Sequence, residues 1–128
     1  MHTKSKIMIP VVVGVAIGAA ATQGLHAQAK LKAYGVAEVE VLSPADLMSY
    51  VPPVSKEIGQ SHGRSLRTLS GRVVSIEGSP PPKNVAIVEW DSMDDAMAFY
   101  KSKAWTYLAP QRDKAQKTIR RYVVEVEK

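Results

Sequence analysis

His62 is the residue of this chain best suited to acid–base chemistry near neutral pH. The other two histidines, His2 and His26, lie close to the N-terminus, so a general base built on imidazole elsewhere in the chain would have to be His62. The simpler alternative is a surface histidine that ends a helix beside Gly63. Spacing supplies no partner for His62, and one histidine cannot form a metal site made of several.

Aromatic side chains suggest a second kind of site. Trp90, Tyr100 and Trp105 could line an apolar pocket with a few polar tips, which is the usual form of a small-molecule site. Arg67 is a further candidate contact to such a ligand. The alternative is that these aromatic side chains, at a strand end and on helix faces, belong to the hydrophobic core.

Glutamates in the expected strands are a third group of candidates. Facing an apolar space between sheets, a glutamate would have a raised pKa and could act as an acid or a base. Alternation along a strand more simply places such residues at the surface or beside arginines such as Arg67, Arg72 and Arg121. The glutamates concerned are Glu38, Glu40, Glu77, Glu89 and Glu125.

Composition excludes several classes of chemistry. The chain has no cysteine, which removes disulfides, thiolate nucleophiles and iron–sulfur ligation. It also has no glycine-rich phosphate loop, no G-x-S-x-G elbow and no acidic metal cluster, so we expect no cofactor and no metal. Whether the protein is an enzyme stays open.

The first 29 residues have the three parts of a cleavable secretory signal peptide. Lys4 and Lys6 provide the positive start, an apolar run follows, and Ala27-Gln28-Ala29 is an A-x-A cleavage site. The apolar run is shorter than the roughly 20 residues that a bilayer requires, although an uncleaved anchor is the alternative. We expect cleavage after Ala27 or Ala29 and a periplasmic or secreted protein without stable membrane association.

The remaining residues, 30–128, have the length of a single domain. Without Lys4 and Lys6 this part of the chain has 15 basic residues against 12 acidic ones. The basic residues are interleaved with Asp and Glu rather than gathered among aromatic side chains, so we expect no nucleic-acid partner.

Four segments have the pattern of strands. Residues 33–42 and 119–127 alternate apolar and polar side chains with a period of two. Residues 64–77 predict a strand with a bend at Ser70-Gly71. Residues 84–90 are almost wholly apolar, which is typical of a strand covered on both faces.

Helices are expected between these strands. Ser43 and Pro44 supply an N-cap and a first-turn proline, and Pro52-Pro53 should break the helix that follows into two short pieces. Ser92 caps a second helix, and residues 102–108 add a further helical turn. The resulting β-α-β-β-α-β order predicts a ferredoxin-like α+β fold, a four-stranded antiparallel sheet with its helices on one face.

Several of these segments, in their order and spacing, resemble a known family. The segments are Val39-Glu40-Val41, His62-Gly63, Gly71-Arg72-Val73, Ile76-Glu77-Gly78, Asn84-Val85-Ala86-Ile87-Val88-Glu89-Trp90 and Phe99-Tyr100-Lys101-Ser102. Together they resemble the domain-of-unknown-function family 1330, in the dimeric α/β-barrel superfamily. The resemblance implies a homodimer in which the open faces of two sheets meet, which would also cover the apolar strand at 84–90.

The expected function is therefore that of an exported, homodimeric, small-molecule-binding or accessory domain. The alternative is a cofactor-independent monooxygenase or isomerase, because superfamily relatives include cofactor-free monooxygenases. A third possibility is that the domain binds another exported protein.

Overall fold

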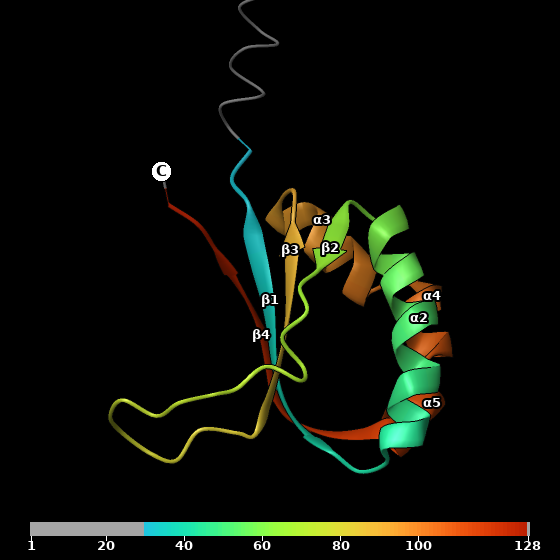
Figure 1. Cartoon of the computed structure of the whole chain (residues 1–128). Helices are drawn as coiled ribbons and strands as arrows, with labels where there is room; N and C mark the ends of the chain where they lie inside the picture. The colour runs from blue at the N-terminus through green and yellow to red at the C-terminus, as the bar shows by residue number, and fades with distance from the viewer. Residues whose placement is uncertain (1–29, 128) are drawn as a thin grey trace, which may run out of the picture. The chain divides into compact units, whose positions relative to one another are not determined.

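The computed structural model describes residues 30–127. They form a four-stranded antiparallel sheet, in the order β2-β3-β1-β4, with the helices packed on one face (Figure 1). This arrangement confirms the predicted α+β, ferredoxin-like fold class. The elements are β1 (Ala33–Val41), α2 (Pro44–Gln60), β2 (Gly63–Ser65), β3 (Asn84–Trp90), α3 (Met93–Tyr100), α4 (Lys103–Tyr107), α5 (Ala109–Ala115) and β4 (Gln116–Glu125).

β1 lies inside the sheet, paired with β3 on one edge and with β4 on the other. Its inward side chains are small, and Ala33 and Ala37 are buried. Gly35, between them, has no room for a side chain, because a Cβ there would lie 2.7 Å from the Tyr100 hydroxyl oxygen and 3.2 Å from Trp90 Nε1. The small residues of β1 thus let large aromatic side chains pack directly on the sheet.

α2 is one continuous helix, so the expected break at Pro52-Pro53 is wrong. Ser43 caps the helix by accepting a hydrogen bond from the Asp46 amide at 3.2 Å. Pro53 cannot donate to the carbonyl of Ser49, but the Gln111 side chain of α5 donates to that carbonyl at 3.0 Å. This bond from another helix replaces one that proline removes.

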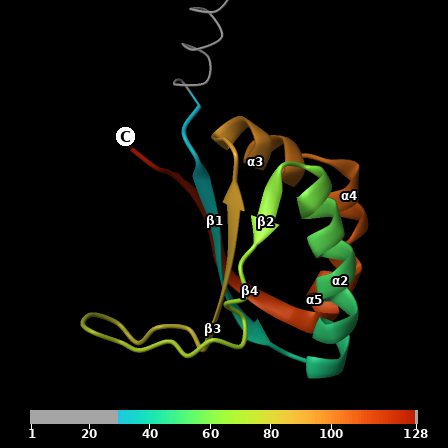
Figure 2. The ribbon, with the colours of Figure 1, turned by 45° about the horizontal axis from the view of Figure 1, so that its top comes forward.

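The expected strand over residues 64–77 is also largely wrong. β2 contains three residues, and residues 66–83 form a long connection that projects away from the helices (Figures 1 and 2). The chain turns at Thr68, whose carbonyl accepts from the Gly71 amide at 2.9 Å, while the Thr68 side chain donates to the Val85 carbonyl at 2.6 Å. The side-chain bond takes the place of a main-chain ladder bond, and strand pairing ends there.

The segment before the last strand contains one more helix than expected. Pro110 does not end helical structure but occupies the first turn of α5, where its missing N–H has no cost. β4 accordingly begins at Gln116 and ends at Glu125, whereas the sequence predicted residues 119–127.

Among the described residues, all helices lie on one face of the sheet and none packs on the other (Figure 1). Val36 of β1 pairs with Ile87 of β3 and with Tyr122 of β4, which makes an apolar row across this open face. Tyr122 and Val124 expose 47% and 52% of their surface. Residues 84–90 contribute Ile87 to this row, and the expected cover of the strand on both faces stays a prediction.

Candidate functional site

A cavity of about 100 Å³ lies between α2 and the inner face of the sheet. Its walls are mostly apolar, and its polar lining includes a tyrosine, a glutamine and an arginine. α2 contributes Tyr50, Val54 and Ile58, because residues four apart share one face of a helix. Other lining residues come from β3, α3, α4 and β4, among them Ala86, Phe99, Trp105, Gln116 and Arg121.

Packed aromatic rings form one side of the cavity. Tyr100 and Trp105 both line it, with ring centres 5.1 Å apart and an edge-to-face angle of 87°. Phe99 lies 5.5 Å from Trp105 and 5.0 Å from Trp90. Trp90 itself is fully buried behind these rings, and its indole Nε1 has no hydrogen-bond partner in the structure.

Two arginines share the ring of Trp105. The guanidinium carbon of Arg112 lies 3.6 Å from the ring centre, and that of Arg121 lies 4.8 Å from it. Arg121 faces inward because it pairs with Ala37, on the helix-covered side of β1. Stacking on an aromatic face is favourable for a guanidinium group, and more so where water is excluded.

Tyr50 and Gln116 provide neutral polar groups in the same cavity. Burial raises the pKa of the Tyr50 hydroxyl, and the nearby guanidinium groups of Arg112 and Arg121 oppose this rise without cancelling it. The hydroxyl is therefore protonated near neutral pH. Gln116 is 5% exposed, and its side chain makes no hydrogen bond within residues 30–127.

The structure separates the residues that the sequence singled out. Tyr100 and Trp105 line the cavity, and Trp90 packs behind them. His62 is exposed in the turn between α2 and β2, with a positive φ of 66°, and Arg67 is exposed in the connection that follows. Neither His62 nor Arg67 lines the cavity.

Sequence reasoning did not find the polar residues of the cavity. Tyr50 lies on a helix whose packing the sequence alone does not specify, and Gln116 precedes the predicted start of the last strand. For Arg121 the sequence does contain an indication. Alternation along β4 places Arg121 on the same side of the sheet as Val123, which packs against the core.

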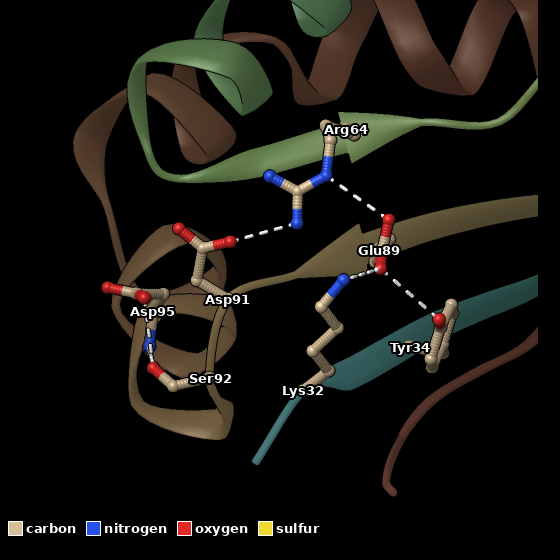
Figure 3. Close-up of polar contacts among 7 residues, drawn as sticks. All are labelled: Lys32, Tyr34, Arg64, Glu89, Asp91, Ser92 and Asp95. Atoms are coloured by element: carbon tan, nitrogen blue, oxygen red, sulfur yellow. Dashed lines mark hydrogen bonds and ion pairs between the residues drawn. The ribbon is translucent and has the colours of Figure 1, made fainter. Parts of the chain in front are cut away.

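Two of the strand glutamates, Glu38 and Glu89, form ion pairs, and their pKa values are lowered rather than raised. Figure 3 shows Glu89 of β3 between Lys32, at 2.7 Å, and Arg64, at 3.2 Å, with the Tyr34 hydroxyl at 3.3 Å. Hydrogen bonds from Lys32 and Arg64 lower the pKa of Glu89 to about 2. On the same face, Arg120 lowers the pKa of Glu38, so both carboxylates are ionised near neutral pH.

Metal-binding clusters and membrane-spanning helices are both absent from the described part of the chain. Residues 30–127 contain no group of three or more His, Asp and Glu side chains placed to hold a metal ion. Within the same range, no helix is both long enough and apolar enough to cross a membrane.

These features define the class of protein, a ferredoxin-like α+β domain with a small cavity between its helices and its sheet. Within this class the chain belongs to the DUF1330 family, a domain of unknown function whose model matches residues 32–126. No curated protein matches the chain.

Solved structures share the fold at low sequence identity. One is SnoaB from Streptomyces nogalater, described as a cofactor-independent oxygenase, with 13% identity and a TM-score of 0.55 over 77% of this chain and 95% of SnoaB. Another is a protein of unknown function from Rhodopseudomonas palustris, with 11% identity and a TM-score of 0.55 over 76% of this chain and 82% of that protein. At these identities the likeness establishes the fold alone.

Proposed function

We propose that this protein is an exported, homodimeric domain that binds a small organic molecule in the cavity between α2 and the sheet. The observation that carries the proposal is the lining of that cavity. Apolar walls from Val54, Ala86 and Phe99 surround a few polar groups, which is the composition of small-molecule sites in general.

The lining favours binding over proton transfer. Within residues 30–127, the residues that line the cavity include no histidine, aspartate or glutamate. An arginine such as Arg121 offers N–H donors and no acceptor, and the raised pKa of Tyr50 makes its phenolate a minor species. A general base near neutral pH is therefore missing from the residues that line the cavity.

A cofactor-independent oxygenase or isomerase is the second candidate function. It is supported by the fold shared with SnoaB and by the aromatic side of the cavity, where Tyr100 and Trp105 meet. An apolar or aromatic substrate that reacts with oxygen without the help of a protein base would be compatible with this cavity. Oxygen uptake with a candidate ligand, measured with an oxygen electrode, separates this function from simple binding.

The open face of the sheet supports the homodimer. The apolar row of Val36, Ile87 and Tyr122 lies between two groups of paired charges, one around Glu89 and the other formed by Glu38 and Arg120. A second copy placed against this face would bury the row and keep the charges near its rim. Exposed apolar surface of this kind is typical of an interface. Binding of another exported protein is the alternative occupant.

Export is the part of the proposal that depends on residues 1–29, which lie outside the described residues. Its support is the sequence pattern of a positive start, an apolar run and the Ala27-Gln28-Ala29 site. Release of residues 30–128 by cleavage would leave the whole of the described domain intact.

Native mass spectrometry of the protein recovered from its export compartment tests all three parts. We expect a dimer of chains that begin at Gln28 or Lys30, with additional mass from a retained small molecule. Full-length chains would contradict cleavage, and monomers would contradict the dimer. A dimer that releases no small molecule on denaturation would weigh against the binding function and favour a role in contact with another protein.

A further inference from the structure

The two arginines that stack on Trp105 differ in their ion pairing from the arginines on the open face of the sheet. Arg64 and Arg120 form ion pairs with acidic side chains on the open face. Within residues 30–127, Arg112 and Arg121 form none, although both are partly buried and both stack on the same indole ring. Two positive charges therefore share one ring without a carboxylate to balance them.

This arrangement has an electrostatic cost. Like charges at close range repel, and partial burial weakens the solvent screening that would otherwise reduce the repulsion. Stacking on Trp105 is favourable for each guanidinium group, and more so where water is excluded. An anion bound beside Arg121, the arginine that lines the cavity, would supply the missing negative charge.

The other polar groups of the cavity can serve the same anion. The Tyr50 hydroxyl is protonated and can donate a hydrogen bond, and its burial keeps competing water away. The Gln116 amide, 5% exposed and without a hydrogen bond inside the described chain, offers two further N–H donors. A carboxylate accepts several such bonds at once, and Arg recognises it in a planar, two-point geometry.

The apolar walls and the volume of the cavity determine the polarity and the size of the rest of the ligand. Val54, Ala86 and Phe99 present apolar surface, which suits a hydrocarbon body. The volume of about 100 Å³ is smaller than the roughly 300 Å³ at which drug-sized pockets begin. Room therefore exists for one ring or a short branched chain.

From this arrangement we infer that the cavity selects a small organic carboxylate, with the acid group at Arg121 and a single-ring or short branched apolar body against α2 and β3. The inference rests on the proposed binding function and adds its ligand class. Charge recognition by Arg121, with donors from Tyr50 and Gln116, provides the selectivity over neutral molecules of the same shape.

Matched pairs of probes test this inference. Benzoate is compared with benzyl alcohol, and isovalerate with isopentyl alcohol, by isothermal titration calorimetry on the mature wild-type dimer freed of any retained ligand. We expect at least one acid to bind more tightly than its alcohol by about tenfold or more, because hydrogen bonds to a charged group are stronger than those between neutral groups. This comparison needs no variant.

Variants then assign the selectivity to a residue. Arg121→Met should remove the preference for the acid, and Arg121→Lys should restore part of it. Arg67→Met is the matched control, since Arg67 is exposed and does not line the cavity, and it should bind as the wild type does. Retained acid preference in a folded Arg121→Met protein would overturn the assignment.

The remaining outcomes distinguish the inference from the proposed function. Alcohols that bind as tightly as the acids would contradict charge selection and leave small-molecule binding in place. If none of the probes binds the wild type, both the carboxylate class and the binding function lose their support.

Discussion

Gln111 of α5 donates a hydrogen bond of 3.0 Å to the main-chain carbonyl of Ser49, the carbonyl that Pro53 leaves without its usual helical donor. A helix that contains Pro52-Pro53 is thereby held to a neighbouring helix at the point where its own bonding fails. The packing of Tyr50, Val54 and Ile58 on the core supports the same segment. The continuity of α2 positions these three residues at the cavity.

The contribution of this bond depends on Pro53. We expect Gln111→Ala to lower the free energy of unfolding by about 0.5–1.5 kcal/mol in the wild type. In a Pro53→Ala background the restored main-chain amide can bond to the Ser49 carbonyl, so the same change at Gln111 should cost much less. Urea denaturation of the four proteins measures the coupling. Equal costs in both backgrounds would show that the Gln111 bond does not compensate for proline.

Gly35 should tolerate no larger residue. A methyl group there meets the Tyr100 hydroxyl at 2.7 Å and Trp90 Nε1 at 3.2 Å, so we expect Gly35→Ala to destabilise the protein by about 1–3 kcal/mol. Gly59→Ala is the control, because a Cβ at this helical position meets nothing within 4 Å. That change should stabilise the protein by about 0.4–1 kcal/mol. Thermal denaturation compares the two, and a neutral Gly35→Ala would contradict the packing described.

Glu89 should make stability depend on pH in the acid range. Its pKa is about 2 in the folded protein, against 4.5 ordinarily, so the folded state favours the carboxylate. The stabilisation is complete above pH 4.5 and is lost as the pH falls toward 2. Glu89→Gln should therefore melt below the wild type near neutral pH.

Melting temperatures across this pH range provide the measurement. The gap between wild type and Glu89→Gln should shrink steadily as the pH falls from 4.5 to about 2. Glu77→Gln, at an exposed position in the connection between β2 and β3, is the control and should follow the wild type. A gap that stays constant with pH would mean that the Glu89 charge is not what stabilises the fold.

The open face should determine the oligomeric state. If the proposed homodimer forms through this face, Tyr122→Asp should give a monomer, because it places a charge in the apolar row beside Val36. Tyr107→Asp alters an equally aromatic but 84% exposed residue on the helical side, and should leave the dimer intact. Sedimentation equilibrium distinguishes the two. A Tyr122→Asp protein that remains dimeric would place the interface elsewhere.

The strands and caps were predictable because their signals are local. Alternation along β1 and the Ser43 cap of α2 were read directly from neighbouring residues, and the element order then specified the fold. The predictions for α2 and β2 were wrong because each of these elements depends on a hydrogen bond to a residue far away in the sequence. Gln111 preserves the helix at Pro53, and the Thr68 side chain ends the pairing of β2.

The cavity was predictable only in its aromatic half. Trp105 and Tyr100 are conspicuous residue types, and both line it. Arg112 and Arg121 come from different elements that meet only at the Trp105 ring, so no spacing in the sequence relates them to it. His62, the residue type best suited to acid–base chemistry, lies outside the cavity because a turn residue at positive φ was needed where α2 gives way to β2.

Filling the cavity shows whether it holds a small organic ligand. Ala86 lines the cavity, and Ala86→Phe should occupy its volume without touching the open face. Small molecules released from the wild-type and Ala86→Phe proteins, purified in parallel, are compared by mass spectrometry. We expect a compound that the wild type carries and the folded variant lacks. The same compounds in equal amounts from both proteins would contradict it.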